Sequence, residues 1–165
     1  MDDGIARMGE VVFSRPGLTE LRALGLGSCI GLCVFDPQLK LACMAHVVLP
    51  QAKSPDTPEP GKYADTAVPY VLKEMLARGA VQYRMRVAIA GGAQLFTFDG
   101  SDSKLDVGKR NAEGVKQMLV QARLKLVAED IGGKSGRTLT MDATTGCIMV
   151  KQAGNEGKLL ANFLS

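Results

Sequence analysis

One short stretch of the chain concentrates the residues that could carry covalent chemistry. Residues 24–50 hold three of the four cysteines and the only histidine of the 165-residue sequence. A thiol beside an imidazole is the usual arrangement for attack on an acyl carbon, because the imidazole can take the thiol proton. The same residue types bind zinc, and cysteine is also among the most often buried residues. The stretch therefore raises three hypotheses: a nucleophile, a metal site or ordinary core.

The spacing of these residues predicts a hairpin that brings two of them together. Apolar segments flank an Asp-Pro pair at residues 36 and 37, which favours a type I turn. A four-residue loop that starts at Asp36 pairs Phe35 with Lys40. Continued along both strands, this register sets Cys29 directly opposite His46, with Cβ atoms about 4.5–5.5 Å apart. A slip of one residue would turn the two side chains to opposite faces.

The same geometry argues against a zinc site. Cys43 and His46 are an odd number of positions apart in one strand, so their side chains face opposite ways. Cys29 and Cys33 lie about 13 Å apart along the other strand at ~3.3 Å per residue. Four ligands cannot meet at one ion from these positions, given Zn–S bonds of about 2.3 Å. We therefore expect no metal here, and we assign Cys33 and Cys43 to the core.

The setting of Cys29 favours chemistry without deciding the question. The sequence "GLGS" precedes the cysteine, so the chain approaches the sulfur with several free backbone N–H groups. The N–H groups of Ser28 and Cys29 could hold an oxyanion. Cys29 could equally be a buried thiol, and His46 a core histidine whose ring is satisfied by a carbonyl. The residues alone leave both interpretations open.

Hydrophobic spacing and turn residues predict the elements that position this hairpin. Further strands are expected at residues 10–14, 20–24, 84–90, 124–130, 137–143 and 147–152. Helical spacing begins at Asp65, which is expected to be an N-cap, and stops at Gly79; a second helix fits residues 108–122. The segment from Gln51 to Lys62 contains three prolines and is expected to be an exposed loop, either framing the site or simply connecting. The order of elements indicates an α/β sandwich with a mixed sheet and two main helices.

Composition narrows the class of protein further. With 46% hydrophobic residues, the chain can bury the core of one domain over residues 1–165. Its start lacks a secretion signal and no stretch is long and apolar enough to span a membrane, so we expect a cytoplasmic protein without membrane insertion. The four cysteines are expected to be reduced thiols. The net charge of +3 comes from scattered basic residues, which argues against nucleic acid as a partner.

A series of motifs carries a resemblance to a known family. In chain order they are "LGLGSCIGLCVFDP", "MAHVVLP", "KYADTAV", "GGAQLF", "VGKRNAEGV" and "EDIGGKSGRTL". From about Leu21 to Met149, the sequence resembles the chemoreceptor glutamine deamidases, the CheD proteins of bacterial chemotaxis. The "GLGSC" motif together with the "AH" pair is the most specific part of this resemblance.

The resemblance implies both an activity and a set of partners. It implies a three-layer α/β fold and an enzyme, a cysteine-dependent protein-glutamine glutaminase. Such an enzyme hydrolyses selected glutamine side chains of methyl-accepting chemotaxis receptors to glutamate and releases ammonia. The resemblance maps the nucleophile onto Cys29 and the base onto His46, implies a CheC-type CheY phosphatase as partner, and implies no metal or organic cofactor.

One departure from the family pattern concerns the group that orients the base. The family often has a threonine six residues before the nucleophile, and this chain has Ala23 there. The third member of a triad is then missing, or it comes from a backbone carbonyl or a side chain elsewhere. Two alternatives to the deamidase also stay open: a weakly catalytic or non-catalytic regulator that binds the phosphatase, and a thiol hydrolase acting on a small amide.

Overall fold

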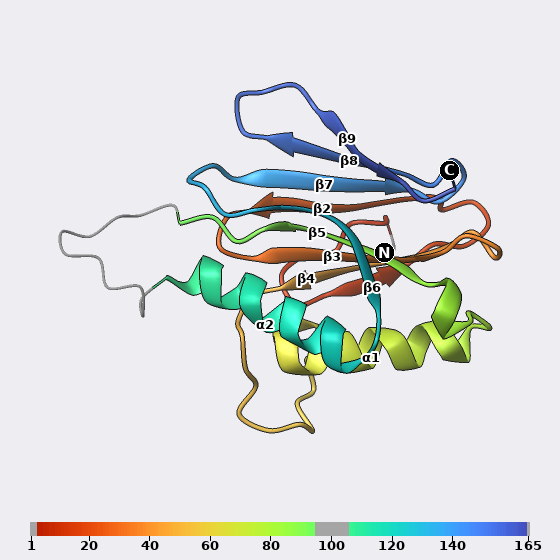
Figure 1. Ribbon diagram of the computed structural model, residues 1–165, viewed down its shortest axis with the longest axis horizontal. Helices are drawn as coiled ribbons and strands as arrows, with labels where there is room; N and C mark the ends of the chain where they lie inside the picture. The colour runs from red at the N-terminus through yellow and green to blue at the C-terminus, as the bar shows by residue number, and fades with distance from the viewer. Residues whose placement is uncertain (1–2, 95–105, 165) are drawn as a thin grey trace.

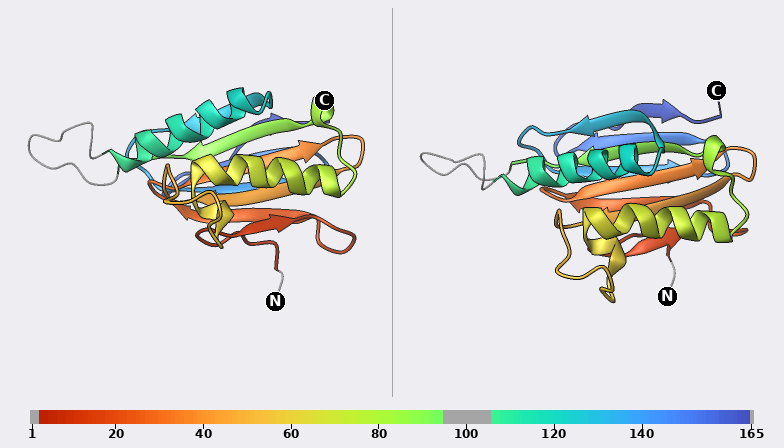
Figure 2. Two further views of the ribbon diagram at one scale, coloured as in Figure 1. Left: turned by 90° about the horizontal axis from the view of Figure 1, so that it is seen from below. Right: turned by 60° about the horizontal axis from the view of Figure 1, so that its bottom comes forward.

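The chain folds into three layers: a four-stranded sheet, a five-stranded sheet and a pair of helices (Figure 1). The computed structural model describes residues 3–94 and 106–164. The two sheets pack face to face, and both helices cover the other face of the five-stranded sheet (Figure 2). This arrangement confirms the expected α/β fold with three layers, a mixed sheet and two main helices.

The five-stranded sheet carries the hairpin at its centre. In spatial order its strands are β1 (Val11–Phe13), β4 (Leu41–Val47), β3 (Ile30–Asp36), β5 (Arg86–Gly91) and β6 (Lys125–Ile131). Strands β5 and β6 run parallel, whereas the other neighbouring pairs are antiparallel, so the sheet is mixed. Strands β3 and β4 are buried on both faces, which explains why their sequences are almost continuously apolar.

The four-stranded sheet is antiparallel and covers the face of the hairpin that lies away from the helices. Its strands are β2 (Glu20–Leu26), β7 (Arg137–Asp142), β8 (Cys147–Gln152) and β9 (Lys158–Asn162). Sequence analysis predicted no strand after residue 152 and no second sheet. Strand β9 is mostly exposed, so it lacks the alternation of buried and exposed residues by which a strand is recognised.

The two helices lie where hydrophobic spacing predicts them. Helix α1 spans Ala64–Ala77 and helix α2 spans Val107–Gln121. Each buries a stripe of aliphatic side chains against the five-stranded sheet, including Val71 of α1 and Val115 of α2. Helix α2 also approaches the backbone after β5 closely, because a Cβ atom at Gly108 would lie 2.4 Å from the Ala93 carbonyl oxygen.

The segment from Gln51 to Lys62 is largely exposed, as expected, and its last residues form a short 3₁₀ helix, η1 (Pro60–Lys62). The expected N-cap of α1 is wrong: the N-cap is Tyr63, and Asp65 already lies in the first helical turn. The Asp65 carboxylate accepts the backbone N–H of Ala52 at 3.0 Å instead. The aspartate therefore ties the beginning of this loop to the helix.

The register of the hairpin differs from the predicted one by two residues. Strands β3 and β4 pair so that Asp36 lies opposite Leu41 and Gly31 lies opposite His46. The loop still has four residues, but it begins after Asp36, because that residue stays in the strand. Its buried carboxylate is held by the Arg84 guanidinium and accepts the Val81 N–H at 3.0 Å. Because the shift is even, it preserves the face to which every side chain points.

Candidate active site

Cys29 and His46 lie at the same end of the hairpin and on the same face of the sheet, although not directly opposite each other. Cys29 ends the bend before β3, two residues from the Gly31 that faces His46 in the ladder. Cys29 packs in the core between the sheets. His46 points to the same side, because its strand neighbours Ala45 and Val47 pack against the helices on the other face. Cys29 is 8% exposed and His46 is 3% exposed. The predicted shared face is confirmed, and the predicted direct opposition is wrong.

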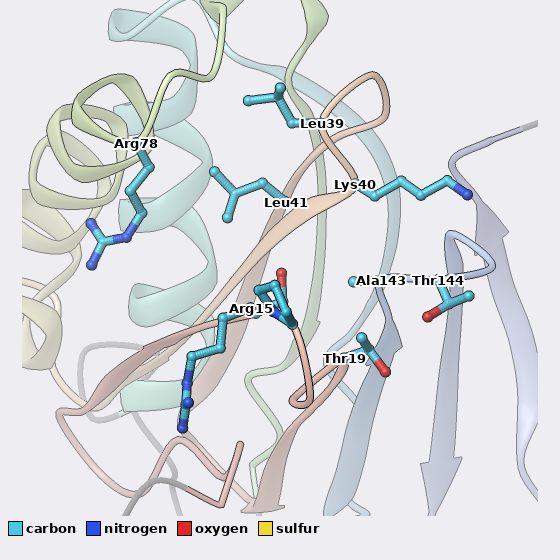
Figure 3. Close-up of a pocket in the computed structure, with 10 residues that line it drawn as sticks. Arg15, Thr19, Leu39, Lys40, Leu41, Arg78, Ala143 and Thr144 are labelled. Carbon is cyan, nitrogen blue, oxygen red and sulfur yellow. The ribbon is translucent and has the colours of Figure 1, made fainter.

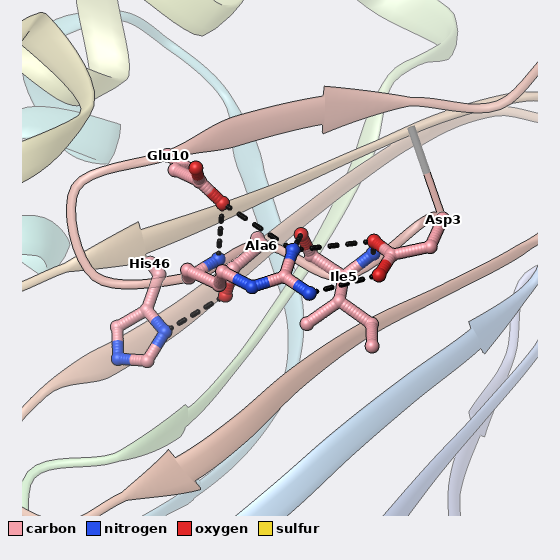
Figure 4. Close-up of polar contacts among 6 residues, drawn as sticks. Asp3, Ile5, Ala6, Glu10 and His46 are labelled. Atoms are coloured by element: carbon pink, nitrogen blue, oxygen red, sulfur yellow. Dashed lines mark hydrogen bonds and ion pairs between the residues drawn. The ribbon is translucent and has the colours of Figure 1, made fainter. Parts of the chain in front are cut away.

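The ring of His46 is held by a backbone carbonyl. Its Nδ1 lies 2.9 Å from the carbonyl oxygen of Ala6, which can only accept a hydrogen bond, so Nδ1 carries the proton (Figure 4). The unprotonated Nε2 is buried and has no hydrogen-bond partner among the described residues. Burial lowers the pKa of His46, while the Ala6 hydrogen bond and the charge of Glu10 oppose that shift. The ring is therefore a neutral base with a free nitrogen.

The segment from Asp3 to Glu10 holds this carbonyl in place. The Ala6 N–H donates to the Arg22 carbonyl at 2.8 Å, which fastens the segment to β2. The His46 carbonyl accepts the Gly9 N–H at 2.8 Å, and the His46 N–H donates to the Glu10 carbonyl at 3.0 Å. The bonds at Ala6, Gly9 and Glu10 thus fix the Ala6 carbonyl beside Nδ1 of the imidazole.

Exposed charged side chains of this N-terminal segment bind one another. The Arg7 guanidinium lies 2.8 Å from the Asp3 carboxylate, and the Arg7 backbone N–H donates to the Glu10 carboxylate at 2.9 Å. The hydrogen bond from Arg7 lowers the pKa of Asp3 to about 2. Sequence analysis missed this segment altogether, because a backbone carbonyl gives no signal in a sequence. In this chain, which has alanine at position 23, the Ala6 carbonyl is the group that the His46 Nδ1 contacts.

Ala23 itself borders the site. It is fully buried on β2, and a Cβ atom placed on Gly31 would lie 3.4 Å from the Ala23 Cβ. The pair at Gly31 and His46 therefore faces Ala23 across the space between the sheets. A longer side chain at position 23 would extend toward Gly31.

The backbone around Cys29 is fixed through its carbonyl groups. The Gly27 carbonyl accepts the Ala93 N–H at 2.8 Å, and the Cys29 carbonyl accepts the Gly92 N–H at 2.9 Å. In contrast, the N–H groups of Ser28 and Cys29 donate no hydrogen bond to any residue that the structure describes. The two groups predicted to face an oxyanion are therefore available as donors. Burial raises the pKa of the Cys29 thiol, so the thiol is neutral in the resting protein.

The glycine pair after β5 allows this close approach. Gly91 has a φ of 117°, which disfavours other residues, and a Cβ atom there would lie 2.1 Å from the Cys29 carbonyl oxygen. Any side chain at Gly91 would push the Cys29 bend away from β5. The "GGA" sequence at this point therefore shapes the site, although from the sequence alone it was recognised only as part of a family motif.

The other cysteines are apart from this chemistry. Cys33 packs between the two sheets and Cys43 packs against the helices, and both are fully buried, as predicted for core residues. Burial raises the pKa of both thiols. Cys43 and His46 point to opposite faces of β4, as strand alternation requires. Among the described residues, no group of three or more cysteine, histidine or acidic side chains could hold a metal ion.

A separate hollow of about 430 Å³ lies at the other end of the hairpin, beside its turn (Figure 3). Arg15, Lys40 and Arg78 contribute to its lining, together with Thr19 and Thr144. It lies roughly 20 Å along the strands from Cys29, at ~3.3 Å per residue. Since no cysteine or histidine lines it, this hollow is separate from the chemistry at Cys29.

Neither helix of the described chain is long and apolar enough to cross a membrane.

Comparison with known proteins gives this site a family context. The sequence profile described as "CheD chemotactic sensory transduction" matches residues 48–152. That span begins after His46, so the match does not depend on the cysteine and histidine pair. A protein of Clostridium botulinum named "Probable chemoreceptor glutamine deamidase CheD" is 40% identical over 92% of this chain and 91% of its own length.

Two further relatives agree with that match. One from Desulfitobacterium hafniense, with the same name, is 44% identical over 85% of this chain and 88% of its own length. The "Chemoreceptor glutamine deamidase CheD" of Thermotoga maritima is 40% identical over 90% of each chain. The order of motifs, the three-layer fold and these relatives lead to one conclusion. The chain belongs to the CheD family.

Proposed function

We propose that this chain is a protein-glutamine deamidase that acts on methyl-accepting chemotaxis receptors. It would hydrolyse selected glutamine side chains to glutamate and release ammonia, through a thioester on Cys29. One observation carries the proposal: the buried Nε2 of His46 has no hydrogen-bond partner within residues 3–94 and 106–164, and the ring shares a face with the Cys29 thiol. The printed names of the relatives support the same reaction and the same substrates.

The first step is formation of the thioester. In the resting site both groups are neutral, because burial raises the pKa of Cys29 and lowers that of His46. As the sulfur attacks the glutamine carboxamide carbon, Nε2 takes the thiol proton, so charge develops only during the reaction. The free N–H groups of Ser28 and Cys29 stabilise the oxyanion of the tetrahedral intermediate. The imidazolium then gives its proton to the departing nitrogen, and the C–N bond breaks.

The second step is hydrolysis of the thioester. Nε2 of His46 takes a proton from a water molecule, whose oxygen attacks the thioester carbon. The same N–H groups hold the second oxyanion. The S–C bond breaks, the imidazolium returns its proton to Cys29, and the product is glutamate.

The Ala6 carbonyl takes the part that a threonine side chain plays in many family members. Its hydrogen bond at 2.9 Å fixes the tautomer with Nδ1 protonated and stabilises the imidazolium when it forms. This assignment removes the main reason to regard the chain as a non-catalytic regulator. A CheC-type CheY phosphatase as partner and a cytoplasmic location stay part of the proposal, and they rest on the family alone.

Mass spectrometry of a receptor fragment tests the reaction. Wild type should convert glutamine to glutamate, which changes the fragment mass by the difference between an amide and an acid. Cys29→Ala should leave the fragment unchanged, and Cys33→Ala, a matched buried thiol, should retain activity. An active Cys29→Ala beside an inactive Cys33→Ala would refute the assignment of the nucleophile. If wild type is inactive on every receptor fragment but binds a CheC-type phosphatase, the regulator becomes the better interpretation.

A further inference from the structure

A buried asparagine of helix α2 connects the two halves of the site. The side chain of Asn111 is fully buried. Its Nδ2 donates to the Ser28 carbonyl at 2.9 Å and to the Val48 carbonyl at 2.8 Å. Ser28 precedes the nucleophile, and Val48 follows the strand that carries His46. One amide group from a distant helix thus contacts both catalytic segments.

The position of this amide in the hairpin is informative. The last pair of the β3 and β4 ladder is Ile30 with Val47, so the next pair would join Cys29 to Val48. At that point the Asn111 amide bridges the two segments in place of a direct ladder bond. The asparagine therefore sets the distance between the strands where the site begins.

The orientation of the amide is determined by its partners. Both neighbours are carbonyl oxygens, which only accept hydrogen bonds, so the NH₂ group must face them. The Asn111 Oδ1 is buried and has no hydrogen-bond partner among the described residues. A buried acceptor without a partner is unfavourable for stability. The amide therefore satisfies two backbone carbonyls while its own oxygen stays unpaired among the described residues.

Fixing the Ser28 carbonyl also fixes a catalytic donor. The Ser28 carbonyl and the Cys29 N–H belong to one planar peptide unit, and in a trans peptide the two groups point in opposite directions. Because the carbonyl points to α2, the Cys29 N–H points away from that helix. The Cys29 side chain also lies on the side away from the helices, in the core between the sheets. The thiol and the N–H therefore approach a bound carboxamide from the same side of the sheet.

We infer that Asn111 is a positioning residue of the deamidase site, which aims the Cys29 N–H at the oxyanion and spaces the Cys29 bend from the His46 strand. The inference rests on the proposed function. It predicts that loss of the amide lowers the rate of the chemical step and leaves the thiol itself reactive. Val115 offers a matched control. It lies on the same helix and is buried in the core between the helices and the five-stranded sheet, whereas the reaction takes place on the opposite face of that sheet.

The test compares wild type, Asn111→Ala and Val115→Ala as full-length proteins. Three quantities are measured: kcat and KM on a receptor fragment, the rate of Cys29 alkylation by iodoacetamide resolved by mass spectrometry, and the melting temperature. For Asn111→Ala we expect kcat to fall by about a hundredfold, the effect of losing one oxyanion donor, with KM and alkylation within about threefold of wild type. Val115→Ala should lower the melting temperature and keep kcat. Alkylation needs no oxyanion, so it separates the donor from the thiol.

Several results would overturn the inference. A wild-type kcat in Asn111→Ala would overturn it. A rate of Cys29 alkylation that falls in parallel with kcat would also overturn it, because the loss of activity would then come from a less reactive thiol or a disturbed fold. If Asn111→Ala does not fold, Asn111→Ser is measured in its place. Its hydroxyl can donate to only one carbonyl, so kcat should fall about tenfold, and an unchanged kcat overturns the inference. A wild type without deamidase activity overturns the proposed function, whereas an active wild type beside an equally active variant overturns this inference alone.

Discussion

The two halves of the site are held in different ways. On the Cys29 side, buried donors hold the carbonyls of residues 27, 28 and 29. These donors are the backbone N–H groups of Gly92 and Ala93 and the side-chain amide of Asn111. On the His46 side, the ring depends on a carbonyl of an N-terminal segment whose ion pairs are exposed. Exposed ion pairs contribute little to stability, because water and salt screen them. The nucleophile is thus held by buried groups alone, whereas the orientation of the base depends on Ala6, a buried residue in an otherwise largely exposed N-terminal segment.

This contrast suggests how the imidazole is oriented in a chain that has alanine at position 23. A threonine on β2 would orient the imidazole from within the core between the sheets. In this chain the Ala6 carbonyl does so from an N-terminal segment that packs Ala6 into the same core and is fastened by backbone hydrogen bonds to β2 and β4. The base is therefore the half that is easier to disturb without unfolding the protein.

The largest expected effect comes from removal of the base itself. His46→Ala should lower kcat by at least about a hundredfold, because general-base catalysis contributes roughly 10² to 10⁴. His46→Asn is the sharper variant, since its amide can still donate to Ala6 but cannot take the thiol proton. Both are assayed by receptor deamidation. A near-normal rate in His46→Asn would show that the base lies elsewhere.

The second prediction concerns removal of the Ala6 carbonyl, which orients His46, without a change on the Cys29 side. Deletion of residues 2–7 removes the Ala6 carbonyl and leaves β1 and the Gly9 bond to His46. We expect kcat to fall by on the order of a hundredfold, the cost of misplacing a catalytic group by about 1 Å. Alkylation of Cys29 and the circular dichroism spectrum should change little. Deletion of residues 2–4 is the control, and a comparable loss in that variant would contradict a specific role of Ala6.

The third prediction concerns the protonation of the only histidine. Its NMR titration needs no assignment, and the midpoint should lie below the value of about 6.5 of a free histidine, because burial lowers the pKa of His46. Since the neutral ring is the base, kcat/KM should stay level at neutral pH and fall below that midpoint. The pair can titrate as a coupled unit, so the rate profile is compared with the NMR midpoint directly. A midpoint above 6.5 would contradict a buried neutral base.

The smallest effect is expected from restoring the family threonine. Because the Ala6 carbonyl already orients the ring, Ala23→Thr should change kcat/KM by less than about threefold in the full chain. In the variant that lacks residues 2–7, the same substitution should raise the rate, since the hydroxyl can replace the lost acceptor. Ala23→Val tests whether the added volume alone has an effect. A gain of tenfold or more in the full chain, about 1.4 kcal/mol, would mean that Ala6 orients the base poorly.

The sequence by itself determined which side chains share a face. Strand periodicity is two, so the prediction that Cys29 and His46 point the same way survived a register error of two residues. Apolar spacing likewise placed both helices within one residue of their observed ends, apart from the earlier end of α1 at Ala77. The motifs that identified the family also contain Asn111 and the Gly91 turn, although their roles were not apparent from spacing.

Only the tertiary structure decided what surrounds the pair. The Ala6 carbonyl is 40 residues from His46, and the Asn111 amide is 83 residues from Ser28. Every residue carries a carbonyl, so nothing in a sequence distinguishes the one that the chain path brings to the ring. In the hairpin, Asp36 stays in the strand, where its buried carboxylate is bound by the guanidinium of Arg84, a residue 48 positions further along the chain. Local periodicity is encoded in neighbouring residues, whereas hydrogen-bond partners depend on how distant segments pack.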